Sequence, residues 1–299
     1  FTTLKNVQKM EEEAKRVGYA AVNPYSAVGK FMRAYMYYEM TMLVGDLPLD
    51  EALSSATTLS PKYATQKEVF VQVLKWLDEA NSEMGALITG GTTSIAGDIY
   101  FNGDLLAWQK ANNAFTLRVL IALSKKEGDA DLNVKSKFSN IVSNPAKYPL
   151  LASNRDGLQY VYNSTFNKYP TNPDNFGFDA TRYNMSATTL NTLATLKDPR
   201  AMMFAEPAGN KMKAGLQPTD YAAFVGAESS LDLADMTTKA GIDNGAAYLP
   251  GEYSFYNRKR YYSTYTAENT ILVGYAEMCF NMAEAANRGW ISANAKTWY

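Results

Sequence analysis

Two stretches of the sequence, residues 160–183 and 248–265, concentrate aromatic rings outside the segments that show helical periodicity. Together they hold 14 of the 34 Tyr and Phe residues within 42 positions. Side chains that can hydrogen-bond hydroxyl groups lie in or beside both stretches: Asn172, Asn175, Asn257, Arg258 and Arg260. An aromatic ring can stack on the apolar C–H face of a sugar while amide and guanidinium groups bind its polar edge. The two stretches therefore predict a surface suited to carbohydrate.

From these stretches we predict eight glycan-binding residues: Tyr169, Asn175, Phe176, Tyr256, Asn257, Arg258, Tyr261 and Tyr262. The alternative for each ring is structural. Tyr and Phe side chains in extended loops commonly pack onto the body of a protein and fill a small satellite core. The sequence leaves both roles open for every one of these rings.

Catalysis is the other chemistry to consider, and the composition argues against it. The chain has no histidine and a single cysteine, Cys279, which excludes histidine-based triads, histidine-ligated metals and an intrachain disulfide. A carboxylate pair could still hydrolyse glycosidic bonds. Glu277 and Glu284 share one helix face but lie about 10.5 Å apart along its axis, beyond the ~5–9.5 Å of such pairs. We predict a protein that is not an enzyme, with no cofactor and no metal.

The overall composition is that of a globular protein. Apolar residues make up 46% and charged residues 20% of the chain, with a net charge of −1. No block of basic residues provides the cationic surface that nucleic acid requires, so we expect no nucleic-acid partner. No apolar run approaches the roughly 20 residues that span a bilayer.

Helical periodicity defines the elements that must position the aromatic stretches. We predict helices at residues 2–17, 27–44, 64–87, 105–126, 131–142, 186–197 and 269–288. In the second helix the apolar face comprises Phe31, Ala34, Tyr35, Tyr38 and Met42. Gly45 is expected to end this helix and Pro48 to lead an extended exit, while Thr65 and Glu68 form a capping box for the third.

These patterns predict a mainly α fold in which helix pairs stack as hairpins. Residues 160–183 and 201–268 lack periodicity and predict a loop-rich, irregular part that faces the ligand. The chain has no clean self-match at a period of about 34 residues, so it does not predict a true tetratricopeptide array.

Five blocks of these helices, in this order, resemble the SusD/RagB family. The blocks are Arg33-Ala34-Tyr35-Met36-Tyr37-Tyr38 with Gly45-Asp46-Leu47-Pro48-Leu49; Val73-Leu74-Lys75-Trp76-Leu77-Asp78-Glu79-Ala80; Trp108, Ala111-Asn112, Leu117-Arg118 and Ser124; Asp198-Pro199-Arg200; and Tyr275-Ala276-Glu277, Phe280, Ala283-Glu284-Ala285 and Arg288-Gly289. The loop regions do not visibly match. The resemblance implies tetratricopeptide-like helix pairs with a loop-rich part, in one domain over residues 1–299.

The resemblance also implies a function. Such a protein is an outer-membrane lipoprotein on the cell surface of a Bacteroidetes-like bacterium, where it binds oligosaccharide or another nutrient and delivers it to a SusC-like TonB-dependent transporter. The alternative is a helical interaction scaffold, a lid on the transporter with no sugar site of its own. We expect the chain to be a fragment that lacks the N-terminal signal and lipid anchor, its only membrane attachment, and part of the C-terminus.

Overall fold

A computed structural model describes residues 2–53, 58–176, 184–240, 242–243, 247–248 and 251–299. The chain forms two compact units. Unit 1 comprises residues 1–160 and 271–299, and unit 2 comprises residues 161–270. The organisation of residues 1–299 as a single domain remains a prediction.

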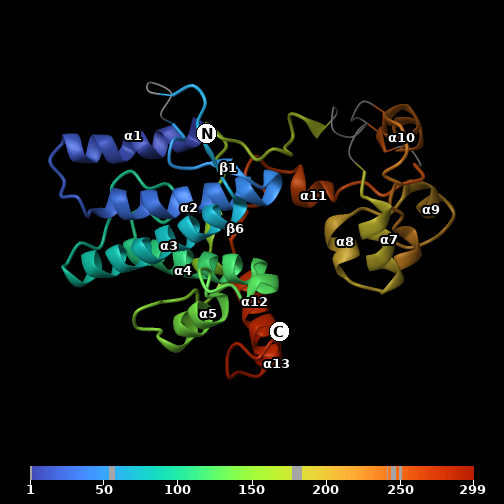
Figure 1. Cartoon of the computed structure of the whole chain (residues 1–299). Coiled ribbons are helices and arrows are strands. Elements are labelled where there is room, and N and C mark those ends of the chain that lie inside the picture. The colour runs from blue at the N-terminus through green and yellow to red at the C-terminus, as the bar shows by residue number, and fades with distance from the viewer. Residues whose placement is uncertain (1, 54–57, 177–183, 241, 244–246, 249–250) are drawn as a thin grey trace. The chain divides into compact units, whose positions relative to one another are not determined.

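Unit 1 is built from helices joined by short strands. Its elements are α1 (Thr2–Arg16), α2 (Pro24–Val44), β1 (Leu47–Pro48), β2 (Tyr63–Ala64), α3 (Gln66–Thr89), α4 (Leu105–Ala122), η1 (Ser124–Lys126), α5 (Val134–Ser143), η2 (Asn154–Asp156), β3 (Leu158–Tyr160), β6 (Thr270–Val273, whose first residue belongs to unit 2), α12 (Tyr275–Asn287) and α13 (Ala295–Trp298). Helix α1 packs on α2, α2 along α3, and α3 along α4 (Figure 1). The predicted mainly α fold is confirmed.

The ends of α2 follow from local hydrogen bonds. The Asn23 side chain accepts from the backbone N–H groups of Tyr25 and Ser26 at 2.9 and 3.0 Å, and the Ser26 hydroxyl accepts from the N–H of Asn23. This capping box starts the helix at Pro24, three residues before the predicted start. Gly45 ends it with φ +80°, which favours glycine, and β1 is the predicted extended exit.

Helix α3 begins as predicted. The Thr65 hydroxyl accepts from the Glu68 N–H at 3.3 Å, and the Glu68 carboxylate accepts from the Thr65 N–H at 2.7 Å. The Thr65 N–H and the Thr65 hydroxyl, which both donate to the Glu68 carboxylate, lower the pKa of Glu68 because they favour its charged form. The capping box therefore fixes where α3 follows the β1–β2 pair.

The predicted helix at 269–288 is wrong in its first turn. Residues Thr270–Val273 form strand β6, which pairs with β3, and the helix α12 starts only at Tyr275. Three of the four strand residues are β-branched and Gly274 follows them, so the local sequence favours an extended segment and a break before the helix. The helical spacing of Ile271 and Leu272 was coincidental.

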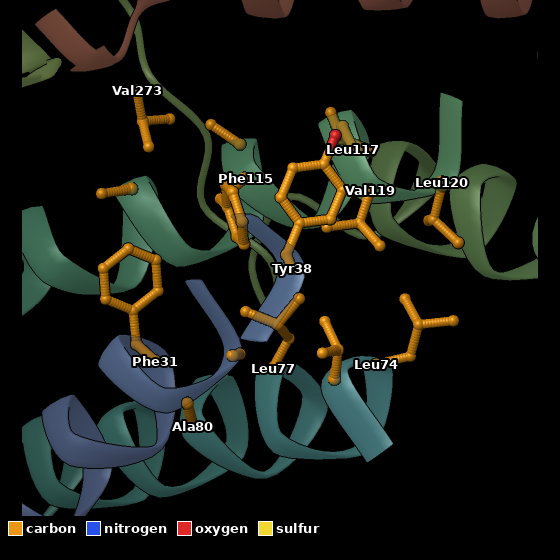
Figure 2. Packing of buried hydrophobic residues seen from close by; sticks show 14 of the residues in the cluster. Phe31, Tyr38, Leu74, Leu77, Ala80, Phe115, Leu117, Val119, Leu120 and Val273 are labelled. Atoms are coloured by element: carbon orange, nitrogen blue, oxygen red, sulfur yellow. The ribbon is translucent and has the colours of Figure 1, made fainter. Parts of the chain in front are cut away.

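The core of unit 1 is aromatic at its centre (Figure 2). The ring of Phe115 in α4 meets Phe31 and Tyr38 of α2 edge-on, with centroids 5.9 and 5.3 Å apart. Leu77 of α3 and Val273 of β6 belong to the same buried cluster. Edge-on packing lets large rings fill the space between helices, so α2, α3 and α4 form one apolar body.

The predicted apolar face of α2 is wrong at Met42. This side chain is 51% exposed, and its neighbours Leu43 and Val44 are exposed as well. They occupy the last turn of α2, and the described residues around that turn do not cover them. Periodicity identifies a face, but it does not show how far along the helix a neighbour covers it.

Two polar side chains of α4 anchor it to other elements. The Asn112 side chain is fully buried and donates to the carbonyl of Leu77 in α3 at 3.0 Å. Arg118 donates to both carboxylate oxygens of Glu277 in α12 and, at 2.7 Å, to the carbonyl of Leu272 in β6. Burial opposes the charge on Arg118, but Glu277 outweighs it and raises the pKa.

Unit 2 has shorter elements. They are α7 (Ala187–Thr195), α8 (Arg200–Phe204), α9 (Gly209–Lys213), η3 (Tyr221–Ala223), α10 (Leu233–Ala240), β4 (Ile242–Asp243), β5 (Ala247–Tyr248) and α11 (Arg258–Tyr261). Met185, Leu190, Ala201 and Phe224 form part of its largest buried cluster. The Asp198 carboxylate accepts from the N–H and the side chain of Arg200, which braces the start of α8.

We predict that replacing Arg118 destabilises unit 1 more than replacing an exposed arginine. Arg118→Met removes the hydrogen bonds of a largely buried guanidinium to Glu277 and to the carbonyl of Leu272. Because the Glu277 carboxylate left behind is 41% exposed, we expect a loss of about 2 kcal/mol in the free energy of unfolding. The control is Arg288→Met, because Arg288 forms an exposed pair with Glu284 four residues away on α12; its loss should stay under about 1 kcal/mol. Urea denaturation followed by circular dichroism measures both, and equal losses would contradict the prediction.

A second prediction concerns alkaline pH. Tyr37 is 3% exposed, and burial raises its pKa to about 12. The unfolded phenol has a pKa near ~10, so this contribution to stability is complete below pH ~10 and is lost as the pH rises toward ~12. Between pH ~9 and ~11.5 the unfolding free energy of the wild type should fall by about 2 kcal/mol more than that of Tyr37→Phe.

Urea denaturation at a series of pH values tests this prediction. Tyr63→Phe is the control, since it removes a phenol from an exposed ring. It should keep the wild-type profile. Parallel profiles for the wild type and Tyr37→Phe would refute the assignment.

Candidate functional site

Four of the predicted site residues lie on or beside the short helix α11 of unit 2. Asn257 precedes the helix and its side chain accepts from the Arg260 N–H at 3.1 Å. Its backbone N–H donates to the carbonyl of Phe204 in α8 at 2.9 Å. Asn257 therefore fixes α11 against α8, so the structure gives it a positioning role.

A pocket of about 460 Å³ opens beside α11. Its lining comprises Pro173, Phe176, Arg258, Lys259, Tyr262 and Ser263. The structure thus brings Phe176, Arg258 and Tyr262, three of the eight predicted residues, to one pocket. The pocket is wide open to solvent, so it is a surface depression and not an enclosed cavity.

A carboxylate fixes the guanidinium of Arg258. Its Nε lies 3.0 and 2.9 Å from the two carboxylate oxygens of Glu206, and its backbone N–H also donates to Glu206. The central carbon of the Arg258 guanidinium lies 5.7 Å from the centroid of the Phe176 ring, which is a cation–π contact. Arg258 therefore joins the charged and aromatic parts of the pocket.

Backbone hydrogen bonds place Glu206 next to Arg258. The Glu206 N–H donates to the carbonyl of Phe255 at 2.8 Å, and Ala205 is bridged to Tyr256. This pairing aligns the segment that follows α8 with the segment that leads into α11. The position of Arg258 is set by contacts more than fifty residues apart in the chain.

Tyr262 takes the structural role that the sequence left open. Its side chain is only 5% exposed and stacks on Phe255 with ring centroids 6.0 Å apart. Phe176 meets both rings edge-on at 5.2 and 5.7 Å. Phe176 is only half-buried, so its ring both packs on this cluster and borders the pocket. Of the predicted rings it is the one placed to contact a ligand there.

Tyr256 and Tyr261 do not line the pocket. Their rings meet edge-on at 6.0 Å, and Tyr256 also packs against the largest buried cluster of unit 2. Arg260 lies over the Tyr261 and Phe204 rings at 5.2 and 5.0 Å and pairs with Glu268. Burial raises the pKa of Tyr261.

Tyr169 and Asn175 belong to the turn that precedes Phe176. The Asn175 side chain accepts from the Asn172 N–H at 2.8 Å and donates to the carbonyl of Pro170. The Asn172 side chain donates to the carbonyl of Tyr169 at 2.7 Å. These bonds hold the turn and place Phe176 at the pocket, so Asn175 acts on the site through the backbone.

Some aromatic residues of the two stretches cannot be placed. Phe178 and Tyr183 lie outside the described residues, as does the side chain of Tyr248. The sequence reasoning missed Pro173, Lys259 and Ser263 as pocket residues. The sequence could have indicated Lys259 and Ser263. They follow the predicted residues Arg258 and Tyr262, and residues four positions apart lie on the same side of a helix.

The carboxylates considered for catalysis serve as ion-pair partners. Glu277 binds Arg118, and Glu284 binds Arg288 at 2.6 Å on the same helix. Within the described ranges no group of three or more histidine, cysteine, aspartate or glutamate residues is arranged to hold a metal ion. None of the described helices is both long and apolar enough to cross a membrane.

A helical body with a pocket of rings and cations has the features of a ligand-binding protein. A family model described as SusD-like, "Starch-binding associating with outer membrane", matches residues 1–299. The chain therefore belongs to the SusD-like family, and the resemblance seen in the helix blocks is confirmed. A comparison with curated protein sequences finds no significant match.

Solved structures agree with this assignment. A SusD homologue from Bacteroides fragilis NCTC 9343 is 35% identical, with a TM-score of 0.84, over 100% of this chain and 59% of its own. An outer-membrane protein from Bacteroides vulgatus ATCC 8482, described in terms of nutrient binding, is 34% identical with a TM-score of 0.84, over 100% of this chain and 61% of its own. A chitin-binding protein at 22% identity and TM-score 0.74 shares the fold. The chain thus spans about three fifths of these proteins.

We predict that Tyr262 is a stability residue. Tyr262→Ala removes a buried ring from the cluster with Phe255 and should lower the free energy of unfolding by about 3 kcal/mol. The control is Phe166→Ala, because Phe166 is 92% exposed in the same unit; its effect should stay within about 0.5 kcal/mol. Urea denaturation measures both, and a negligible loss for Tyr262→Ala would show that this ring does not support the fold.

Proposed function

We propose that the protein is a lipid-anchored glycan-binding protein of the outer-membrane surface, which delivers oligosaccharide to a SusC-like TonB-dependent transporter. Family membership supports the proposal, because the family is described by starch binding and association with the outer membrane. A relative at 34% identity is described in terms of nutrient binding. Ligand, anchor and transporter are parts of the proposal.

The pocket beside α11 is the observation that carries the proposal. Phe176 offers a half-buried ring, and Arg258 offers a guanidinium held in place by Glu206. A sugar ring stacked on Phe176 would bury its C–H face, while its hydroxyl groups accept from Arg258 or exchange hydrogen bonds with Ser263. Because Glu206 and the turn at 169–175 fix these groups beforehand, binding costs little ordering entropy.

A binding role fits the polar groups better than a catalytic one. Glu277 and Glu206 form ion pairs with arginines, and no carboxylate lies among the described residues that line the pocket. Glycoside hydrolysis needs two of them on either side of the scissile bond. We therefore assign the pocket to recognition.

One observation favours a protein partner as well. The last turn of α2 exposes Leu43 at 83% together with Met42 and Val44. Exposed apolar side chains that adjoin one another are typical of interaction surfaces. If the protein is only a transporter scaffold, it will co-purify with a SusC-like transporter and bind no glycan.

Calorimetric titration with a panel of oligosaccharides tests the glycan site. The wild type should bind at least one member, and Phe176→Ala should weaken binding by about 1–2 kcal/mol, roughly 5- to 30-fold, because the stacking surface is lost. Phe166→Ala is the matched control, since it removes an exposed ring of unit 2 that does not line the pocket.

The outcomes separate the alternatives. Equal affinity of Phe176→Ala and the wild type would place the glycan elsewhere on the protein. No binding by the wild type to any glycan would leave the scaffold as the function. Release of reducing sugar by the purified protein would instead revive hydrolysis.

A further inference from the structure

The lining of the pocket beside α11 is one-sided in charge. Among the described residues that line it, Arg258 and Lys259 are the charged ones, and both are cationic. Pro173, Phe176, Tyr262 and Ser263 complete it and carry no charge at neutral pH. A neutral sugar needs no such excess, whereas an acidic ligand would be attracted by it.

The two cations are not equivalent. The charge of Arg258 is matched by Glu206, whose carboxylate lies 2.8 Å from the guanidinium. Lys259 is exposed, and no carboxylate among the described residues forms an ion pair with it. The next cation of α11, Arg260, pairs with Glu268 and lies outside the lining. Lys259 therefore supplies the unbalanced positive charge of the pocket.

The hydroxyl beside Lys259 adds to this picture. The Ser263 side chain donates to the Lys259 carbonyl at 2.6 Å, which leaves its oxygen as an acceptor. A sugar hydroxyl can donate to that oxygen. The pocket thus combines the ring of Phe176 with the hydroxyl of Ser263 and the ammonium of Lys259, and the last two lie four positions apart in the chain.

We infer that this pocket takes an acidic glycan, with a sugar ring on Phe176 and the acid group on Lys259. The inference rests on the proposed glycan-binding function and names its ligand class. The acid group can be a carboxylate, as in a uronate, or a sulfate ester, because both accept charge-assisted hydrogen bonds from an ammonium. Arg258, neutralised by Glu206, contributes orientation and the cation–π contact.

The experiment compares three oligosaccharides of equal length by calorimetric titration at low salt: a neutral glucan, an oligouronate and a sulfated oligosaccharide. At least one acidic ligand should bind fivefold or more tightly than the glucan. Lys259→Gln should weaken that ligand about three- to tenfold and should weaken the glucan less, because the glucan has no acid group for the ammonium to bind. Raising the salt to 0.5 M should remove most of the preference, because it screens an exposed charge.

Lys213→Gln is the matched control. It removes one exposed lysine from α9 of the same unit, and Lys213 does not line the pocket. Its titrations should equal those of the wild type. This control separates the local charge of Lys259 from the net charge of unit 2.

The results distinguish the inference from the function on which it rests. If the glucan binds as well as both acidic ligands, or if Lys259→Gln weakens them no more than Lys213→Gln does, the acidic class is wrong and glycan binding stands. If none of the three binds, and a wider neutral panel also fails, both are wrong. Binding of the uronate alone or of the sulfated ligand alone supports the inference and identifies the acid group.

Discussion

The contact of Arg118 with Glu277 and Leu272 joins the two ends of unit 1. The chain leaves this unit after β3 and returns in β6. Because these two strands are paired, the first and last residues of the segment 161–270 lie close together. Closing so long a loop costs entropy that grows only slowly with its length. The apolar cluster that Val273 joins, together with a guanidinium that cannot be left buried without its carboxylate, offsets that cost. The helical body can therefore carry a long loop-rich insert.

The loops of unit 2 must also be held in place. They have little helical hydrogen bonding to fix them, so side chains do this work. Glu206 binds Arg258, the Asn257 side chain donates to the carbonyl of Met202 in α8, and Phe255 stacks on Tyr262. The sequence analysis set ligand contact against core packing as alternatives for each ring. The structure divides the roles: buried Tyr262 supports the half-buried Phe176, which borders the pocket. A rigid stacking surface requires both kinds of ring.

The helices were predictable because their information is local. Periodicity and the Thr65–Glu68 capping box locate α3, and the polar anchors Asn112 and Arg118 stand out on an apolar helix. The predictions are wrong where contacts with residues far away in the sequence determine the local structure or its burial. Strand β6 exists because β3 lies beside it, and the exposure of Met42 depends on what covers the end of α2. In the site, the composition of the two aromatic stretches was enough to group Phe176 with Arg258. No local pattern reveals that Glu206 neutralises Arg258. Only that ion pair shows Lys259 to be the cation of the lining whose charge is not balanced.

The absence of histidine from the chain has a consequence for recognition. Histidine is the side chain whose charge ordinarily changes between pH ~5 and ~8, while lysine and arginine stay cationic throughout that range. No histidine is therefore available to switch the charge of the pocket near neutrality, and a pH dependence of the proposed binding would come from the acid group of the ligand. A sulfate ester stays charged at every relevant pH, whereas a uronate loses its charge in acid. For the proposed acidic ligand, ionic strength and the chemistry of the acid group would then decide the affinity.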